Sequence, residues 1–293
     1  CNENDISDSN IYIIAVPTPI DKQNKPDLTI TRNASELVGK YLADGDIVIY
    51  ESTVYPGCTE EICIPILEKY SNLLVNKDFY CGYSPERIVP GDKKNTLTKI
   101  CKITSGSDEK TADIVDRLYS SIIPAGTYKA SSIKVAEAAK VAENTQRDIN
   151  IAFTNELSQI CNSIGIDTLD VLEAAGSKWN FLPFRPGIVG GHCIGVDPYY
   201  LAEKSISSGV EPKLILASRE VNESMAEFIS ENVLRELGLY KDLSKCSVGI
   251  LGFTFKDNCP DYRNTKVIDI YNSLVDKVAE VVIADSWADS DAV

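Results

Sequence analysis

Residues 46–57 read DIVIYESTVYPG, a run of apolar residues that passes into polar and turn-forming ones. Such a run predicts a buried strand that leads into a loop. Comparable stretches stand on either side of it, IYIIAVPTP at 11–19 and FYCGYSPE at 79–86. Helical patterns follow the three strands, at 31–45, 59–70 and 112–122. Because strands that alternate with helices form parallel sheets, we expect an α/β fold whose ligands bind beyond the carboxyl ends of the strands.

The pattern changes in the middle of the chain, where no strand is convincing between 124 and 237. Residues 131–165 contain no internal glycine or proline and predict one long helix. Residues 211–238 predict a second long helix that ends at Gly238. Residues 247–285 return to a strand, a helix and a strand, which is again a βαβ unit. The chain therefore holds two α/β regions on either side of a helical one.

The composition excludes several classes of partner. A formal net charge of −14 argues against binding to nucleic acid or to anionic membranes, because both need positive charge on the protein. No apolar run reaches the roughly 18 residues that a membrane-spanning helix needs. The nine cysteines are scattered without a C-x-x-C pair, which indicates reduced thiols in a cytoplasmic protein. An anionic small molecule remains a possible substrate if a few basic side chains converge on it.

The stretch GGHCIGVDPYY at 190–200 holds the one histidine of the chain beside a cysteine. Neighbouring side chains do not face each other on a strand or a helix, so His192 is not expected to act as a base for Cys193. A metal site would need further ligands from elsewhere, and we expect no metal. A glycine-rich turn around a buried cysteine is a simpler alternative. Two features favour a ligand-binding site instead. Gly190 and Gly191 allow a ligand to approach the backbone, and Asp197 follows at a distance that could return it to the same pocket.

A second candidate is the segment KVAEN at 140–144. Lys140 and Asn144 are four residues apart on the predicted helix, so both project from one face. Both side chains donate hydrogen bonds, and such a pair could stabilise a negatively charged oxygen. Glu137 and Asp148 lie near the same stripe, and an ordinary solvated face of the helix is the alternative interpretation.

A third candidate is the loop FTFKDNCPDYRNTK at 253–266, directly after a predicted strand. Its Lys256 and Arg263 are the kind of pair that binds a phosphate-bearing ligand, although ordinary loop charges are the simpler reading. Thr53 and Glu86 lie at the ends of predicted strands, and each is a weak signal alone. A G-x-G-x-x-G fingerprint for a dinucleotide is absent.

Together and in this order, these segments resemble the UDP-glucose/GDP-mannose dehydrogenase family. The matching strings are VPTP (16–19), STVYPG (52–57), SPER (84–87), AAKVAENTQRDINIAFTNEL (138–157), GGHCIGVDPYY (190–200) and GFTFKDNCPDYRNTK (252–266). Residues 176–201 look most like the UDP-N-acetylhexosamine 6-dehydrogenases of surface-polysaccharide pathways, which act on UDP-N-acetylglucosamine or UDP-N-acetylgalactosamine. UDP-glucose enzymes typically have GGSCFPKD, so that His192 here stands in place of a serine and Val196 in place of a lysine.

The resemblance implies two Rossmann-like parallel-sheet domains joined by a central all-helical domain. It assigns 1–123 to the C-terminal part of an NAD-binding domain and 124–238 to a central domain with the dimer contact and the catalytic loop. Residues 239–293 would begin a UDP-binding domain. The family template places the glycine fingerprint in a first βαβ unit upstream, so we expect this segment alone to bind NAD weakly. We also expect a homodimer in the cytoplasm.

The activity of the family implies oxidation of the C6 alcohol of a UDP-sugar to a uronate with NAD as the electron acceptor. Cys193 would attack the intermediate aldehyde, and oxidation of the thiohemiacetal would leave a thioester that water hydrolyses. Lys140 and Asn144 would stabilise charge on the C6 oxygen. Asp197 would orient or activate the water together with Lys140.

The resemblance implies further roles at the loops. Thr53 and Glu86 would position the attacking water, and Thr18 and Thr53 would contact NAD. UDP-glucose enzymes have another glutamate four residues after the Glu86 position, where this chain has Pro90. Four basic residues are candidates for binding the acetamido group, the diphosphate or the sugar hydroxyls: Arg87, Arg185, Lys256 and Arg263.

Three alternatives stay open at this point. The substrate could be UDP-N-acetylmannosamine, which differs only in stereochemistry that depends on details of the pocket, or it could be UDP-glucose. A non-catalytic nucleotide-sugar binding homologue is a rival from another class, against which the intact Cys193, Lys140, Asn144 and Asp197 argue. A cysteine hydrolase would need a base that the sequence does not offer.

Overall fold

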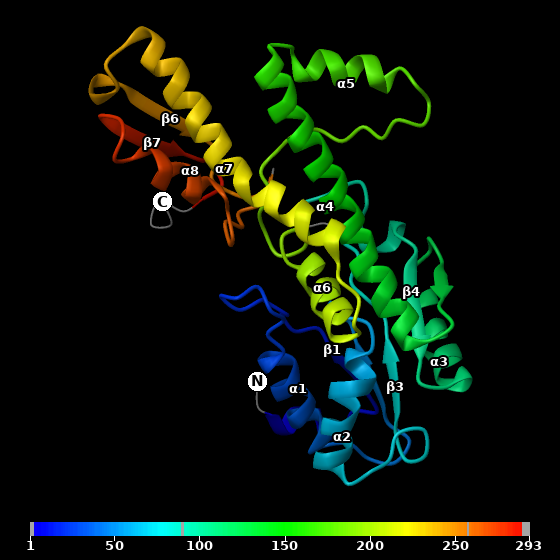
Figure 1. Cartoon of the computed structure of the whole chain (residues 1–293). Coiled ribbons are helices and arrows are strands. Elements are labelled where there is room, and N and C mark those ends of the chain that lie inside the picture. The colour runs from blue at the N-terminus through cyan, green and yellow to red at the C-terminus, as the bar shows by residue number, and fades with distance from the viewer. Residues whose placement is uncertain (1–2, 89–90, 257, 289–293) are drawn as a thin grey trace. The chain divides into compact units, whose positions relative to one another are not determined.

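The computed structural model describes residues 3–88, 91–256 and 258–288 (Figure 1). The chain divides into two compact units. The first comprises Cys1–Glu143 and Tyr199–Val210, and the second comprises Asn144–Pro198 and Glu211–Val293. Across the described residues, no helix is both long enough and apolar enough to cross a membrane.

The first unit contains a five-stranded sheet in the order β1-β2-β3-β4-β5. Its strands are β1 (Ile11–Ile14), β2 (Ile47–Tyr50), β3 (Tyr80–Tyr83), β4 (Lys102–Gly106) and β5 (Thr127–Lys129). The pairs β1–β2, β2–β3 and β4–β5 are parallel, as the alternation of strands and helices predicts.

The pair β3–β4 is antiparallel, so the sheet contains one antiparallel pair beyond the three strands that the sequence predicted. The sequence analysis also missed β4 and β5, and β5 lies in the region where no strand was expected. The connection from β3 to β4 contains only one short 3₁₀ turn, η3 (Leu97–Lys99), in its described part. It therefore lacks the helical crossover that usually joins parallel neighbours.

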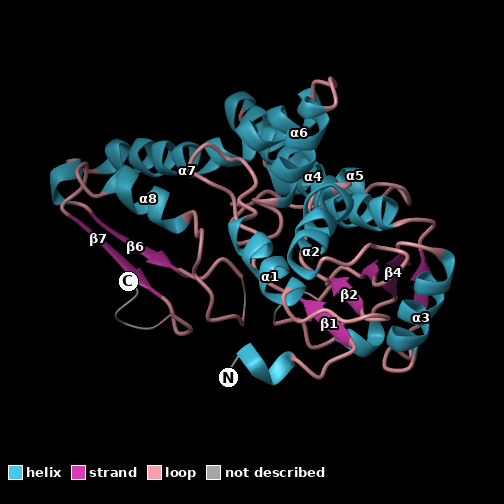
Figure 2. Cartoon of the chain, turned by 90° about the horizontal axis from the view of Figure 1, so that it is seen from below, coloured by secondary structure: helices cyan, strands magenta, loops and turns pink. Residues whose placement is uncertain are grey.

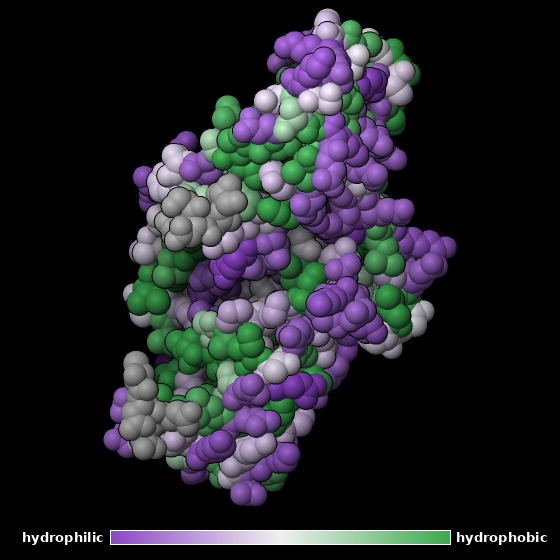
Figure 3. Space-filling view, turned by 90° about the vertical axis from the view of Figure 1, so that its left-hand side faces the viewer, coloured by the Kyte–Doolittle hydropathy of each residue, from purple (hydrophilic) through white to green (hydrophobic). Residues whose placement is uncertain are grey.

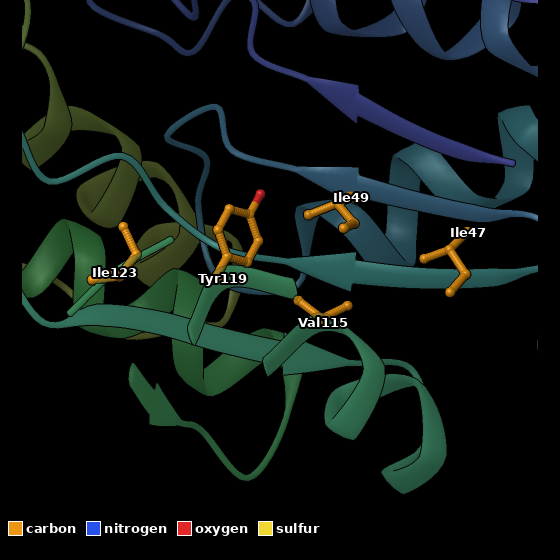
Figure 4. Packing of buried hydrophobic residues seen from close by; sticks show 5 residues of the cluster. All are labelled: Ile47, Ile49, Val115, Tyr119 and Ile123. Carbon is orange, nitrogen blue, oxygen red and sulfur yellow. The ribbon is translucent and has the colours of Figure 1, made fainter. Parts of the chain in front are cut away.

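Helices cover both faces of the interior strand β2, whose four residues are all buried. The helix α3 (Glu109–Ser120) packs against one face and α1 (Thr29–Gly39) lies on the other, where the hydroxyls of Ser35 and Tyr50 are 2.7 Å apart. A π-helical turn, η2 (Thr59–Cys63), continues into α2 (Ile64–Ser71). Figure 4 shows the packed cluster on the α3 side, formed by Ile47, Ile49, Val115, Tyr119 and Ile123.

Both long helices predicted for the middle of the chain are present. They are α4 (Ile133–Ile164) and α7 (Lys213–Tyr240), although α7 continues past Gly238, where the sequence predicted its end. Two shorter helices, α5 (Thr168–Gly176) and α6 (Asp197–Ser207), were not predicted. The side chain of Asp167 caps the first turn of α5 by accepting hydrogen bonds from the amides of Leu169 and Asp170.

The end of the described chain forms the expected βαβ unit. The strands β6 (Ser247–Leu251) and β7 (Glu280–Ala284) are parallel and are joined through α8 (Val267–Leu274), as Figure 2 shows. One face of this two-stranded sheet packs on α7 and α8 around Ala226, Ile270 and Leu274. Side chains of the opposite face are exposed, among them Leu251 and Val282.

The carboxyl ends of β1, β2 and β3 lie side by side because these three strands are parallel. Ser52, just after β2, connects the loops that follow. Its hydroxyl accepts from the amide of Val16 at 2.9 Å and donates to the carbonyl of Val16 at 2.7 Å. The hydroxyl of Tyr83 donates to the carbonyl of Ser52. The loops with VPTP, STVYPG and SPER thus meet at one edge, as predicted.

The surface agrees with the acidic composition. Hydrophilic residues make up much of the face seen in Figure 3, and hydrophobic residues form separate patches between them. A surface of this kind, with a net charge of −14, suits a small anionic ligand only where basic side chains gather.

Candidate active site

Cys193 lies in the turn that precedes α6. None of the eight described cysteines forms a disulfide, and Cys193 is the exposed one among them. Its carbonyl accepts hydrogen bonds from the amides of Val196 at 3.2 Å and Asp197 at 2.9 Å. Burial raises the pKa of the Cys81 thiol well above its ordinary value. An exposed thiol is accessible to a substrate, whereas a buried one such as Cys81 is chemically inert.

Asn144 and Asp197 meet in the second unit. The side-chain nitrogen of Asn144 donates to a carboxylate oxygen of Asp197 at 2.6 Å. Both side chains are buried, at 5% and 3% exposure. The amide has a second N–H, so this contact orients it without using all its hydrogen-bonding capacity.

The face of α4 that carries Lys140 is buried rather than solvated. Lys140 and Asn144 are 8% and 5% exposed, and Glu137 and Asp148 are both at 0%. The alternative of an ordinary solvated charge face is therefore wrong. Burying four polar side chains on one helix is costly unless each has a partner or a ligand.

The loops of the first unit hold Thr18, Thr53 and Glu86. Thr18 and Thr53 are half-buried, and they follow β1 and β2 at the carboxyl edge. The carboxylate of Glu86 accepts from the amides of Arg87 and Ile88, at 2.6 and 2.5 Å, and lies 3.9 Å from the ammonium of Lys102. Glu86 thus holds its own loop in place. The Pro90 that replaces a family glutamate lies outside the described residues.

The two arginines assigned to the acetamido group or the diphosphate differ in their surroundings. The guanidinium of Arg87 forms an ion pair with Glu143 at 2.8 Å and donates to the carbonyl of Cys101 at 2.5 Å. It therefore links its loop to α4. Arg185 is exposed in the loop that precedes the turn with Cys193.

Lys256 and Arg263 lie on the loop that follows β6, and only one of them is committed to a protein partner. Arg263 makes two hydrogen bonds to the carboxylate of Asp261, at 2.9 and 2.6 Å. The Nζ atom of Lys256 is buried and has no hydrogen-bond partner among the described residues. An unpaired buried ammonium calls for an anionic or carbonyl ligand.

Asp285, which the sequence analysis missed, fixes this loop. One of its oxygens accepts from the amides of Phe253 and Thr254, at 2.6 and 2.9 Å. These backbone bonds hold the pKa of Asp285 well below its usual range. An acidic residue at the end of a predicted strand was the available signal, because loops of adjacent parallel strands start at the same edge.

The turn at 191–196, which contains Cys193, packs on the same loop. A Cβ atom at Gly191, whose φ is +81°, would come within 2.6 Å of the ring of Phe255. A glycine is therefore needed at position 191 to accommodate the ring of Phe255. The Nε2 atom of His192 lies 3.7 Å from a carboxylate oxygen of Asp261. Burial, and then the nearby Arg263, lower the pKa of His192, which favours the neutral imidazole.

A buried polar network between α4 and α7 was also missed. Asp148 accepts from Arg219 at 2.6 Å and from the side chain of Asn222 at 2.7 Å. Asn155 extends the network by donating to Asn222 at 2.8 Å. The positions 140, 144 and 148 repeat every four residues on α4, which was the only sequence signal for this buried stripe.

The predicted catalytic residues are divided between the two units. Thr53, Glu86 and Lys140 belong to the first, whereas Asn144, Cys193 and Asp197 belong to the second. Among the described residues, no group of three or more His, Cys, Asp and Glu side chains could hold a metal ion.

Comparison with known proteins agrees with this fold. Profiles of the NAD-binding, central and UDP-binding domains of the UDP-glucose/GDP-mannose dehydrogenase family match residues 2–123, 134–224 and 249–293. A UDP-N-acetyl-D-glucosamine 6-dehydrogenase of Salmonella typhi is 59% identical over 98% of this chain and 68% of its own length. Another from Pseudomonas aeruginosa is 55% identical over 99% of this chain and 69% of its own length.

A solved structure is similar over the same range. The UDP-D-ManNAc dehydrogenase of Pyrococcus horikoshii superposes with a TM-score of 0.91 at 31% identity, covering 98% of this chain and 68% of that one. Fold and matches together define an NAD-dependent UDP-sugar dehydrogenase. The chain belongs to the UDP-glucose/GDP-mannose dehydrogenase family.

Proposed function

We propose that this protein oxidises the C6 hydroxymethyl group of UDP-N-acetylglucosamine or UDP-N-acetylgalactosamine to the uronate, in a four-electron reaction. The observation that carries the proposal is the exposed Cys193 in a turn that leads into Asp197, itself hydrogen-bonded to Asn144. The names of the Salmonella typhi and Pseudomonas aeruginosa relatives support UDP-N-acetylglucosamine as the first substrate to test.

Cys193 is the nucleophile of this reaction. Its sulfur bonds to C6 at the aldehyde stage and holds the carbon as a hemithioacetal and then as a thioester, until water releases the acid. A thiolate suits both steps because it attacks carbonyl carbon readily and its acyl adduct can be hydrolysed. NAD⁺, when bound, supplies the hydride acceptor for both oxidations.

Asn144 and Lys140 stabilise negative charge on the C6 oxygen. One N–H of Asn144 is directed to Asp197, so its second N–H is free of that contact and can be given to the substrate oxygen. Loss of one such donor typically costs about 3–4 kcal/mol in the transition state. Asp197 orients the water that attacks the thioester, with Thr53 and Glu86 as further positioning groups.

The carboxyl edge of the first sheet fits one side of the cofactor. Thr18 and Thr53 offer two half-exposed hydroxyls on loops that Ser52 ties together, and we assign them to NAD. Hydroxyl and backbone donors of this kind suit the amide and ribose groups of a nucleotide. The sequence holds no glycine-rich turn for the pyrophosphate.

The uridine diphosphate is assigned to the loop after β6. The buried, unpartnered Nζ of Lys256 supports this, whereas Arg263 would have to exchange its contact with Asp261 for one with the ligand. We keep Arg87 and Arg185 as candidates for the acetamido group. Of these two, the exposed Arg185 needs no rearrangement to reach a ligand.

We also propose a homodimer formed through the central region. The second unit exposes large apolar side chains on α4, on α5 and on the loop after α5, a pattern typical of interfaces. These side chains are Phe153, Ile160, Ile164, Leu169, Trp179 and Leu182. The proposal includes the domain ranges 1–123, 124–238 and 239–293, a cytoplasmic location, and a role in capsule or O-antigen synthesis. Light scattering of the purified protein would measure the oligomeric state.

The direct test supplies the full-length protein with NAD⁺ and a panel of UDP-sugars and measures the NADH released for each sugar consumed. Two NADH per sugar support the four-electron reaction, and a preference within the panel identifies the substrate. One NADH would indicate oxidation of the alcohol only. No NADH from any sugar would point to a binding protein and refute the proposal, while a preference for UDP-N-acetylmannosamine or UDP-glucose would correct the substrate.

A further inference from the structure

Glu137, on α4, is a buried carboxylate with two backbone partners on a distant segment. Its side chain is 0% exposed. One oxygen accepts from the amide of Gly57 at 2.5 Å, and the other from the amide of Thr59 at 2.9 Å. These amides stand at the start of the π-helical turn η2, where N–H groups lack partners within the helix and favour a negative charge.

This carboxylate joins two segments that carry proposed site residues. Gly57 and Thr59 end the loop that begins after β2 and contains Thr53. Glu137 lies three residues before Lys140, so the two occupy adjacent turns of the same face of α4. All of these residues belong to the first unit.

Glu137 has no cationic partner among the described residues, and two nearby lysines are paired with other carboxylates. Lys134 on α4 forms its ion pair with Glu60, at 3.4 Å, and Lys204 on α6 forms one with Glu61, at 2.7 Å. Titratable and charged groups on the neighbouring segment and on α4 include Tyr55, Cys58, Glu60, Glu61, Cys63, Lys134 and Lys140, and Lys204 of α6 reaches the same segment through Glu61.

We propose that Glu137 is a positioning residue that, in its ionised form, holds the Thr53 loop against the turn of α4 that carries Lys140. The inference rests on the proposed function. Each of its oxygens serves one amide, so a protonated carboxyl group can accept with full strength from only one of them. Protonation therefore weakens one of the two hydrogen bonds, to Gly57 or to Thr59, and loosens the loop.

The ionisation of Glu137 falls in a range where an enzyme can be assayed. Burial raises the pKa of this carboxyl to about 7, even though the two amide hydrogen bonds act in the opposite direction. The loop is therefore fully held above neutral pH and progressively released below it. The turnover number should decline as the pH falls through about 7.

The experiment measures kcat and KM of the full-length protein between about pH 5.5 and 9, for the parent and for Glu137→Gln. A Gln side chain has one acceptor oxygen and does not titrate. We expect kcat of Glu137→Gln at pH 8 to fall about tenfold, with little change in KM, and its acid limb near pH 7 to disappear. A merely structural role would leave the shape of the pH profile unchanged.

Two further variants make the result specific. Glu137→Asp restores the charge on a shorter side chain and should recover part of kcat together with an acid limb. Glu60→Gln removes a carboxylate from the same segment that does not contact these amides. Because the charge of Glu60 raises the pKa of Glu137, this variant should keep the acid limb of the pH profile but displace it to slightly lower pH. An acid limb that persists in Glu137→Gln, or its absence from the parent, overturns the proposal.

A measurement without substrate separates this inference from the proposed function. If the parent releases no NADH, the proposed function has failed, and thermal unfolding as a function of pH then decides the inference. Parent and Glu137→Asp should change stability between about pH 5 and 7, and Glu137→Gln should lack that change. Identical curves for the parent and Glu137→Gln would overturn the role of the ionised carboxylate.

Discussion

The side-chain nitrogen of Asn144 lies 2.6 Å from a carboxylate oxygen of Asp197, although 53 residues separate them in sequence. This contact orients an amide that would otherwise rotate freely, and it leaves one N–H for a substrate oxygen. The pair therefore links the group proposed to stabilise the oxyanion with the group proposed to orient water.

Replacing Asp197 by Asn should uncouple the oxidation steps from hydrolysis. The variant keeps the shape of the side chain but lacks the carboxylate that we propose orients water, so we expect steady-state turnover to fall about 10²-fold or more. Rapid mixing should reveal a burst of two NADH per active site before the slow phase. A variant that turns over at the parent rate without a burst would contradict the role of Asp197.

Replacing Cys193 by Ser should stop uronate formation, because the hydroxyl is a far weaker nucleophile at neutral pH. Cys101→Ser is the matched control, since Cys101 is a less exposed thiol outside the proposed site. Product analysis by mass spectrometry distinguishes uronate from aldehyde. Uronate from Cys193→Ser at the parent rate would refute the assignment of the nucleophile.

The basic residues of the loop after β6 should differ in their effect on substrate binding. Lys256→Ala removes a buried ammonium that has no hydrogen-bond partner among the described residues, and we expect KM for the UDP-sugar to rise about tenfold or more. Arg263→Ala removes a side chain that is paired with Asp261, and its effect should stay below about threefold. Competitive inhibition by UDP should likewise be weakened more by Lys256→Ala than by Arg263→Ala. A larger effect of Arg263→Ala would assign the diphosphate to Arg263.

Replacing Arg219 by Met should destabilise the second unit strongly. It leaves Asp148 buried without its cationic partner, and loss of one member of a buried pair costs about 3–5 kcal/mol. Lys129→Met breaks an exposed pair with Asp113, whose charges water already solvates, so its loss of stability should be much smaller than that of Arg219→Met. Urea unfolding measures both, and equal losses would show that burial of the Arg219 pair has no special cost.

The raised pKa of Glu137 makes stability depend on pH in a defined direction. Its folded-state pKa of about 7 exceeds the ordinary value of 4.5, so the folded protein binds more protons between these two values. This residue's contribution to the free energy of unfolding should therefore decrease as pH rises from 4.5 to about 7, by up to about 3 kcal/mol. Subtracting the free energy of unfolding of Glu137→Gln from that of the parent at each pH isolates this contribution. A contribution that increases with pH would contradict the raised pKa of Glu137.

Much of the fold could be predicted from local patterns. Local patterns of apolar residues predicted three parts of the fold. These are the parallel strands β1, β2 and β3, the long helices α4 and α7, and the βαβ unit of β6, α8 and β7. The strand β4 could not be predicted, because its KITSG sequence is largely polar. Its Lys102 is buried beside two carboxylates from other segments, with the ammonium 3.2 Å from Glu51 and 3.9 Å from Glu86.

The sequence by itself determined the fold class, the family and the identity of Cys193, Lys140, Asn144 and Asp197 as site candidates, because those depend on residue types and spacing. The tertiary structure decided which charges are buried and what they contact. Glu137 looked like part of a solvated face, and Arg263 looked available to a phosphate. Burial and pairing arise from segments far away in sequence, Gly57 and Thr59 for Glu137 and α7 for Asp148, and no local pattern records which segments will pack on a helix.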